Sequence, residues 1–158
     1  MITGEAAAAL REALAGVARA AEAEPDREAC GLVLREASGA LSVEPIPNDA
    51  DRWAAAEPAR FPGGARSGFV LAPRPLRQAL AAAHARGAAL HAVFHSHVEA
   101  PAEPSARDLA EAFQEGEPVL PGVETWIVPV WGGRAGAVRR FTLRGGAFEP
   151  APALPDAP

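Results

Sequence analysis

The chain has 158 residues, 49% of them hydrophobic, which is enough apolar material for one hydrophobic core and too little for two comfortable domains. Its net charge is −5, so no basic face is large enough to neutralise many phosphates, and nucleic acid is excluded as an expected partner. No apolar run approaches the ~18 residues that a membrane span needs, which excludes a membrane protein.

The first predicted element is an amphipathic, alanine-rich helix over residues 5 to 23. Thr3 precedes this helix as its expected N-cap, and Pro25 closes it because proline cannot continue a helix. Two strands are expected next, at residues 29 to 35 and 41 to 45, where apolar runs are bounded by turn-forming residues.

Residues 48 to 66 are predicted to form a long loop, and long loops in compact domains are often functional. Trp53 in this loop could line the rim of a substrate groove, and the alternative is an aromatic residue that anchors the loop to the core. A helix is expected over residues 75 to 87, because its apolar residues recur every three or four positions and Gly87 can end it. Residues 90 to 97 form the next expected strand.

Two further strands are predicted near the end of the chain, at residues 124 to 130 and 135 to 143. Pro129 indicates that the first of them lies at a sheet edge or ends there, since proline cannot donate to a strand ladder. Residues 148 to 158 are proline-rich and carry no core-forming pattern. We therefore expect a flexible C-terminal tail after a single domain over residues 1 to 147.

Three arginines in this region, Arg139, Arg140 and Arg144, are a local exception to the acidic composition. We expect them to lie on a solvated strand edge. The alternative is contact with an acidic partner.

The only cysteine, Cys30, cannot form an internal disulfide, which fits a reducing compartment. Charged residues such as Glu5 and Arg11 interrupt the apolar pattern of the first helix, unlike a secretory signal. We therefore expect a cytoplasmic protein in which Cys30 is a small buried hydrophobic residue. The alternative places Cys30 near the functional site, since it lies two residues from Glu28.

The pattern that indicates function is His95-Ser96-His97, followed by Ser105 and Asp108. Side chains at positions i and i+2 of a strand leave the same face, so His95 and His97 point together. Residues 98 to 104 contain two prolines and form a stiff loop, after which Ser105 opens a helix. Two imidazoles and a carboxylate in this order can bind one metal ion with one coordination position open, as a catalytic zinc requires.

Each part of this pattern also has an ordinary structural interpretation. Ser105 and Asp108 resemble the start of a helix with a capping box. A lone His-x-His pair in a strand is more often incidental than metal-binding. His91 shares strand parity with the pair, and we expect it to be structural because it lies at the start of the strand. The combination of the three parts favours the metal site.

A base is needed beside such a metal, and the best upstream candidate is Glu28, just before the strand that begins near Cys30. A glutamate at the entrance to a strand is usually solvated, so its position alone does not assign the role.

The segments at residues 28 to 32, 95 to 97 and 105 to 108 together resemble the signature of the JAMM (MPN-plus) metallopeptidases, an upstream Glu followed by H-x-H-x7-S-x2-D. All five functional positions match, and the resemblance extends over about residues 5 to 145, including the stretches at 45 to 48 and 69 to 73. Val98 departs from the proline that many relatives have there, which removes no ligand. The metal motifs of zincins and zinc deaminases are absent, and an amidohydrolase barrel needs ~250 residues.

The resemblance implies a three-layer α/β fold in which a mixed β-sheet is flanked by helices, as in JAMM/MPN and cytidine-deaminase-like domains. It implies Zn²⁺ on His95, His97 and Asp108 with water as the fourth ligand, whose pKa the cation lowers. Glu28 would accept the proton of this water and pass it to the leaving nitrogen of an amide. The Ser105 hydroxyl would help to hold the oxyanion.

The resemblance also narrows the substrate to a protein or peptide. Short bacterial JAMM proteins process the C-terminal tails of ubiquitin-like sulfur carriers, and this chain is similar to them in size and lacks long insertions. Two alternatives stay open: a non-catalytic MPN module that only binds partners, and a domain whose zinc is purely structural. The sequence does not define the oligomeric state.

Overall fold

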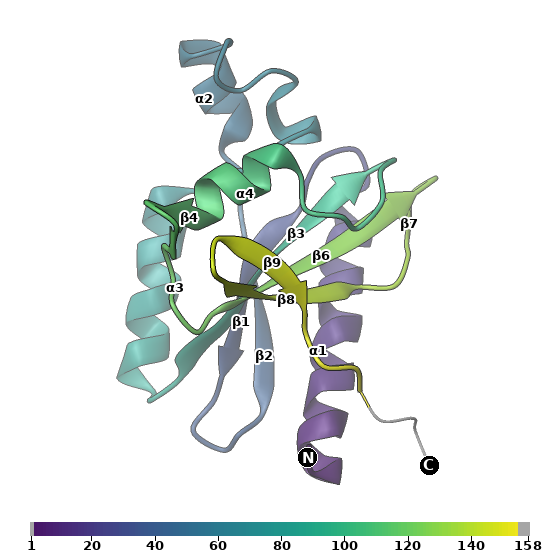
Figure 1. Cartoon of the computed structure of the whole chain (residues 1–158), viewed down its shortest axis with the longest axis vertical. Helices are drawn as coiled ribbons and strands as arrows, with labels where there is room; N and C mark the ends of the chain where they lie inside the picture. Colours follow the sequence, from purple (N-terminus) through teal and green to yellow (C-terminus); the bar gives the residue numbers. More distant parts are fainter. Residues whose placement is uncertain (1, 155–158) are drawn as a thin grey trace.

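A computed structural model of the chain describes residues 2–154. A seven-stranded sheet lies between helices, with strands in the order β2-β1-β3-β6-β8-β9 and with β7 paired to β6 (Figure 1). The elements are α1 (Gly4–Ala23), β1 (Cys30–Arg35), β2 (Leu41–Ile46), α2 (Ala50–Ala56), the 3-10 turn η1 (Gly64–Arg66), α3 (Pro73–Ala85), β3 (Ala89–Val98), α4 (Ala106–Ala112), β4 (Phe113–Gln114), β5 (Glu117–Pro118), β6 (Glu124–Trp131), β7 (Arg134–Ala135), β8 (Arg139–Arg144) and β9 (Ala147–Pro150).

Pairing within the sheet is mixed, which confirms the predicted fold class. β1 runs antiparallel to β2 and β3, β3 runs parallel to β6, and β6 runs antiparallel to β8. Among residues 2–154, no helix is both long and apolar enough to cross a membrane.

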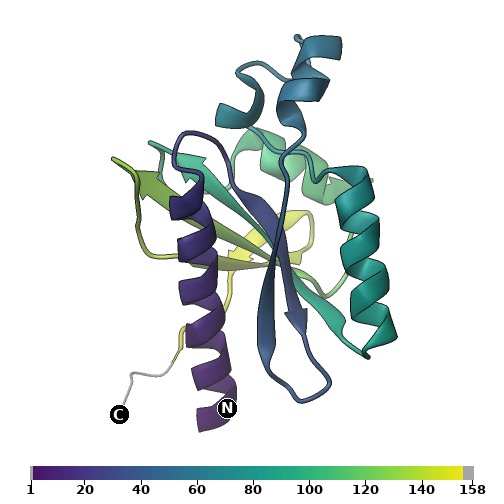
Figure 2. The ribbon, with the colours of Figure 1, turned by 180° about the vertical axis from the view of Figure 1, so that it is seen from behind.

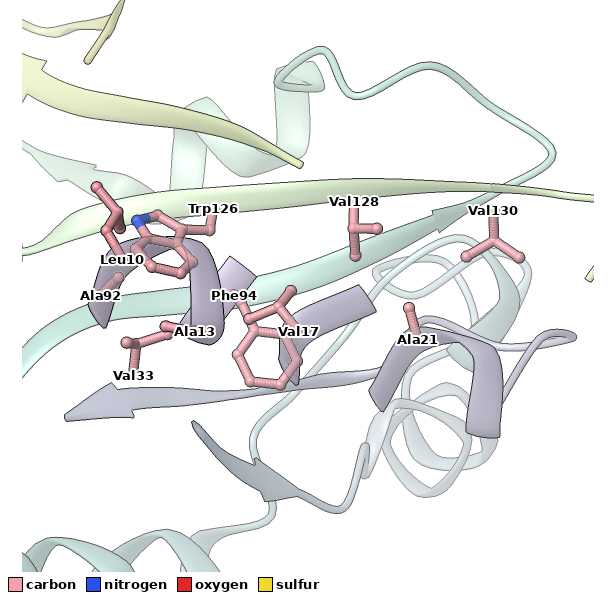
Figure 3. Close-up of a cluster of buried hydrophobic side chains, with 10 residues drawn as sticks. All are labelled: Leu10, Ala13, Val17, Ala21, Val33, Ala92, Phe94, Trp126, Val128 and Val130. Atoms are coloured by element: carbon pink, nitrogen blue, oxygen red, sulfur yellow. The ribbon is translucent and has the colours of Figure 1, made fainter. Parts of the chain in front are cut away.

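Helix α1 covers one face of the sheet, as the view from behind shows (Figure 2). It begins as predicted, because the Thr3 hydroxyl accepts a hydrogen bond from the backbone N–H of Ala6 at 3.3 Å. Its apolar stripe packs on three strands and forms the largest core cluster (Figure 3): Leu10, Ala13, Val17, Ala21, Val33, Ala92, Phe94, Trp126, Val128 and Val130.

The opposite face of the sheet is covered by α3, which packs Ala83 and Leu76 against Leu32 and Leu34 of β1. This helix begins two residues earlier than predicted, and Gly87 follows its end with a φ of +73°, a left-handed conformation that favours glycine. The sheet is therefore the middle layer of three, and its two faces carry separate apolar clusters.

A β-bulge changes the direction of His91. In the β1–β3 pairing, Val33 lies opposite Ala92 and Leu34 lies opposite Leu90, so His91 is an extra residue on β3. Its ring meets Trp126 of the α1-side cluster edge-on, with 5.9 Å between ring centroids. The predicted parity with His95 and His97 is therefore wrong, because the bulge shifts the alternation by one position.

The segment predicted as a loop over residues 48 to 66 contains helix α2 and the turn η1. The Asp51 carboxylate ties the two together by accepting the backbone N–H of Ala65 at 2.8 Å. Trp53 contacts Phe61 across this segment, with ring centroids 6.1 Å apart, and 36% of its surface stays exposed.

Pro129 lies near the end of β6, as predicted, but β6 is not an edge strand, since it lies between β3 and β8. The β6–β8 pairing stops at Ile127, two residues before Pro129. On this side of β6 the Pro129 carbonyl accepts a hydrogen bond from the N–H of Gly136. Proline has no N–H to donate, and its nitrogen faces the gap between the β6–β8 and β6–β7 pairings.

Residues 148–154, predicted to begin a flexible tail, are attached to the domain. Phe148 of β9 packs on Phe141 of β8, with ring centroids 6.0 Å apart, and Leu154 packs against the α1-side cluster. The backbone N–H of Ala151 donates to the Arg140 carbonyl at 2.9 Å. One aromatic and one aliphatic side chain, Phe148 and Leu154, therefore attach this proline-rich segment to the domain. Residues 155–158 lie outside the described residues.

The prediction that the three arginines lie on a solvated strand edge is wrong for Arg140. Its guanidinium forms a two-pronged pair with Glu124, at 2.9 and 3.1 Å, and only 12% of its side chain is exposed. Arg139 pairs with Glu103.

Candidate metal centre

Glu28 lies just before β1, where two distant segments hold its backbone. Its N–H donates to the Ala65 carbonyl at 2.6 Å, and its carbonyl accepts the Asn48 side-chain amide at 2.8 Å. Asn48 also donates to the Gly68 carbonyl and accepts the N–H groups of Ala50 and Val70. The side chain of Glu28 is 4% exposed, so the carboxyl is directed into the protein and is not solvated.

His95 and His97 leave the same face of β3, as the alternation of a strand requires. Both are buried, and their Nε2 atoms lie 3.1 Å apart. Phe69 stacks on the His95 ring with 4.5 Å between centroids. Between them, Ser96 points the other way and its hydroxyl accepts the backbone N–H of Ala29 at 2.7 Å, which fixes β3 beside the segment that carries Glu28.

The loop after β3 orients the second histidine. The Pro101 carbonyl lies 2.8 Å from Nδ1 of His97, and a carbonyl can only accept, so Nδ1 carries the proton. In the neutral ring, Nε2 of His97 then carries the free electron pair and is directed at the site, as in many metal-binding histidines.

Helix α4 brings the third side chain. Ser105 caps it: the hydroxyl accepts the Asp108 N–H at 3.0 Å, and the Asp108 carboxylate accepts the Ser105 N–H at 2.8 Å. The same carboxylate lies 3.3 Å from Nε2 of His95 and 3.3 Å from Nε2 of His97. The capping box and the metal interpretation are thus compatible, because the cap holds Asp108 where it meets both imidazoles.

The separations among these side chains are short enough for them to bind a single metal ion. Ligand atoms ~2.0–2.2 Å from a tetrahedral zinc lie about 3.3–3.6 Å from one another. Nε2 of His95 and Nε2 of His97 lie 3.1 Å apart, and the Asp108 carboxylate meets them through two different oxygens, Oδ1 at 3.3 Å from His95 and Oδ2 at 3.3 Å from His97. Glu28 lies slightly further out, with 3.9 Å between Oε1 and Nε2 of His97, although it still belongs to a group with both histidines in which ligand atoms lie within 4.8 Å. Both carboxylates therefore lie close to the two imidazoles, with Asp108 in the shorter contacts and Glu28 in the group of possible ligands with the two histidines.

Two buried polar atoms of the site lack a hydrogen-bond partner among the described residues: Oε2 of Glu28 and Nδ1 of His95. An acceptor buried without a donor costs free energy, which indicates that something absent from the chain itself satisfies the Glu28 carboxylate. This is the second observation that fits a hydrated cation at the centre.

Burial and charge shift the pKa values of the site in different directions. Burial raises the pKa of Glu28 to about 8, against the opposing attraction of His97. Burial also acts on Asp108, but its hydrogen bonds with His95 and His97 outweigh it and hold the Asp108 pKa well below its usual range. For His97, burial lowers the pKa, yet the bonds to Asp108 and Pro101 outweigh it and the net pKa is raised. One carboxyl is thus tuned to stay ionised and the other to exchange a proton near neutrality.

The structure therefore brings Glu28, His95, His97 and Asp108 together, with Ser105 at their edge. It shows Ser105 as a cap, and it shows no hydrogen bond donated by its hydroxyl within residues 2–154. Cys30 is buried, its thiol contacts the Ile46 carbonyl at 3.3 Å, and burial raises its pKa to about 12, which makes it an inert hydrophobic residue.

Sequence reasoning missed two supporting residues, Asn48 and Phe69. Asn48 uses all its amide hydrogen-bonding capacity to clip the Glu28 backbone to the segments on either side of α2 and η1. Both residues lie in stretches that carry the family resemblance, which was the available signal, but neither has a chemical type that marks a site by itself.

Comparisons with known proteins place these residues in a wider context. The sequence model of the family described as "Prokaryotic homologs of the JAB domain" matches residues 10–144. No curated protein matches the chain. A solution structure of a Desulfitobacterium hafniense protein is similar with a TM-score of 0.58 and 22% identity, over 91% of this chain and 86% of that one. A Salinibacter ruber protein gives 0.58 and 23%, over 93% and 90%. At these identities the two structures support the fold alone.

Proposed function

The chain belongs to the family of prokaryotic JAB-domain homologues, whose members are often JAMM metallopeptidases, and on that premise we propose that it is a zinc-dependent peptidase. The observation that carries the proposal is the convergence of two imidazole nitrogens and the Asp108 carboxylate within 3.1 to 3.3 Å, beside the buried Glu28. Three protein ligands leave one position of a tetrahedral zinc open, as catalysis requires and as structural zinc sites do not provide.

His95, His97 and Asp108 hold the cation in this proposal. A zinc ion bound there supplies Lewis acidity, which acidifies water and polarises the carbonyl of a substrate amide. In this proposal the imidazoles bind as neutral rings, with the proton of His97 on Nδ1 beside the Pro101 carbonyl, and Asp108 supplies negative charge to the cation.

Glu28 acts as the proton carrier. It lies slightly further from His97 than Asp108 does, its carboxyl is buried, and the pKa of about 8 that burial gives it in the metal-free chain shows how readily it holds a proton there. During hydrolysis it would accept a proton from the water as the C–O bond forms and the oxyanion appears, and then deliver this proton to the nitrogen of the scissile amide, so that the C–N bond breaks and the amine leaves.

Ser105 has two roles in the proposal. As the N-cap it holds Asp108 in place, and its hydroxyl proton stabilises the oxyanion that forms on the carbonyl oxygen. Its exposure at the start of α4 leaves this hydroxyl accessible to a substrate.

We propose as substrate the C-terminal tail of a ubiquitin-like sulfur carrier. A disordered tail can enter the site without unfolding of the carrier, and the match over residues 10–144 leaves no room for the long insertions of larger relatives. The reaction would remove residues that follow the mature end of the carrier.

The test uses the full chain loaded with one equivalent of zinc and a carrier that bears extra C-terminal residues, followed by mass spectrometry. We expect a loss of mass equal to the extra residues, abolished by a chelator and reduced by about 10²–10⁴-fold in the Glu28→Gln variant. Glu36→Gln is the matched control, since Glu36 is a surface carboxylate paired with Arg86.

The two alternatives give other outcomes. A partner-binding module would show an unchanged carrier mass with zinc present. A structural zinc would leave every activity intact in Glu28→Gln, while chelation would unfold the domain. Circular dichroism of the chelated protein separates these cases, because a catalytic site predicts a folded but inactive chain.

A further inference from the structure

A cavity of about 220 Å³ lies beside the candidate metal centre, and Glu28 is not among the residues that line it. Two of the candidate ligands, His95 and Asp108, form one end of it. The remainder of the lining is mainly aliphatic and aromatic, and includes Val93, Val119, Leu120, Val123, Leu143 and Phe148. A group held in this cavity therefore lies next to two of the candidate metal ligands.

The wall of the cavity is built on the same helix that presents Asp108. Helix α4 runs directly into the β4–β5 hairpin, and the backbone N–H of Val119 donates to the Ala112 carbonyl at 2.9 Å. Phe113 of this hairpin contacts Phe148 of β9 edge-on, with 5.8 Å between centroids. The apolar wall and the third ligand thus keep a fixed relation to each other.

The charged groups around the cavity already have partners. Glu111 pairs with Arg107 at 3.2 Å. Glu124 accepts from Arg140 at 2.9 Å and from the Trp126 indole at 2.7 Å. A charged side chain entering the cavity would lose its water and find no free counter-charge among these groups, whereas an apolar side chain loses nothing.

The size of the cavity and the exposure of its wall fit one large side chain. A cavity of about 150 Å³ with a similar lining binds benzene, so 220 Å³ has room for an aromatic ring or a branched aliphatic group. Val119 and Leu120 are 51% and 46% exposed, so a substrate residue can reach the wall from solvent. Covering them would remove apolar surface from water.

We infer that this cavity is a specificity pocket, and that it takes the large apolar side chain of a residue next to the scissile amide. The inference rests on the proposed peptidase function, because the position of the pocket against His95 and Asp108 matters only if an amide is held there. It narrows the substrate to a peptide segment with a residue such as phenylalanine, leucine or methionine beside the cleaved bond.

Binding to the pocket is measurable without catalysis. Methyl signals of the metal-free protein are followed by NMR during titration with N-acetyl-phenylalanine amide, and N-acetyl-glycine amide serves as the comparison. We expect the phenylalanine probe alone to shift the methyl groups of Val119, Leu120, Val123 and Leu143. Equal shifts from both probes, or shifts confined to methyl groups elsewhere, would overturn the inference.

Cleavage gives the second readout. Two peptides are compared that differ only in phenylalanine or glycine beside the bond that the zinc-loaded protein cleaves. We expect the phenylalanine peptide to be cleaved at least about tenfold faster, as judged by kcat/KM, which is the discrimination typical of an apolar pocket. Leu120→Glu, at the exposed wall, should reduce this ratio by about tenfold. Leu80→Glu on α3, another exposed leucine that does not line the cavity, should leave it unchanged.

The outcomes separate the two proposals. Failure to cleave either peptide contradicts the peptidase function, and the NMR titration still decides whether the pocket binds an apolar side chain. Zinc-dependent cleavage with no preference for phenylalanine, together with no selective methyl shifts, contradicts the pocket and leaves the peptidase standing.

Discussion

Two polar clusters lie along β3, and they differ in whether the protein completes them. At the start of the strand, His91 lies 2.9 Å from an Arg35 guanidinium nitrogen and 4.0 Å from Glu124. Glu124 in turn accepts bonds from Arg140 and from the Trp126 indole. Burial lowers the pKa of His91, with Glu124 opposing this and Arg35 reinforcing it. Every one of these groups has a partner of its own chain.

At the other end of β3, electron-rich atoms face one another. Two imidazole nitrogens and a carboxylate converge, and a second buried carboxyl, Glu28, has an oxygen without a donor. Cations and hydrogen-bond donors surround His91, which indicates a structural role. Mainly acceptors surround His95 and His97, which indicates a metal site. The predictions below test that distinction.

The largest expected effect concerns Glu28 in the metal-free protein. Its pKa is 4.5 ordinarily and about 8 when buried, so the unfolded chain releases the proton between these values while the folded chain keeps it. Stability from this group is therefore present below pH 4.5 and is lost as the pH rises to about 8. Glu28→Gln removes the cost of ionising this buried carboxyl. In chelator-treated protein, the free energy of unfolding of the variant minus that of the parent should therefore be on the order of 3–4 kcal/mol larger at pH 8 than at pH 5, as measured by urea unfolding.

Glu36 is the control for this pH dependence. Arg86 and Ser42 lower its pKa to about 2, so its stabilising contribution is lost only as the pH falls below about 4.5, and Glu36→Gln should lower stability by nearly the same amount at pH 5 and at pH 8. A Glu28→Gln effect that is the same at pH 5 and pH 8 would contradict the burial of an ionisable carboxyl at this position.

A substitution in the cluster around His91 and Glu124 should change the stability of the protein alone. Glu124→Gln leaves Arg140 half-buried without its counter-charge, and we expect a loss of about 3 kcal/mol in the free energy of unfolding with no change in zinc affinity. Chemical denaturation and a zinc titration of the same sample check both parts. Weakened zinc binding in this variant would show that the two clusters are not independent.

A substitution in the cluster of His95, His97 and Asp108 should change the affinity for zinc. Asp108→Asn keeps the shape of the side chain and removes its charge, and we expect zinc affinity to fall by more than about 100-fold, beyond the usual effect of a residue outside the ligands. A competition titration with a chromophoric chelator measures it. His91→Asn is the matched histidine-strand control, and a similar loss there would remove the distinction between the clusters.

The smallest effect is expected at Ser105. Ser105→Ala removes the acceptor for the Asp108 N–H and should cost about 1 kcal/mol of stability. Ser105→Asn restores the cap without a hydroxyl, so it should recover the stability while hydrolysis stays impaired. Recovery of both in Ser105→Asn would reduce Ser105 to a cap.

Much of the scaffold follows from local patterns in the sequence. The first helix with its Thr3 cap, the strand that carries His95 and His97, and the turn at Gly87 all lie where periodicity and helix-end residues predict them. The mixed sheet with helices on both faces is also as predicted. These features depend on residues near one another in the chain, which is why they can be predicted.

The errors come from contacts between distant segments. The bulge at His91 arises from the pairing with β1, and no residue type at that position announces it. Glu28 alone indicates a solvated carboxylate, yet Asn48 and Ala65 draw its backbone inward. Leu154 docks a proline-rich segment because the α1-side cluster offers it a partner. Only the complete fold supplies these partners.

The central claim is that His95, His97 and Asp108 bind one zinc ion while Glu28 stays outside its coordination shell. X-ray absorption at the zinc edge, on protein loaded with one equivalent and compared with Glu28→Gln and Asp108→Asn, tests it most directly. We predict two imidazole nitrogens and oxygen ligands in a spectrum that Glu28→Gln leaves unchanged and Asp108→Asn alters. A spectrum altered by Glu28→Gln and insensitive to Asp108→Asn would contradict the account.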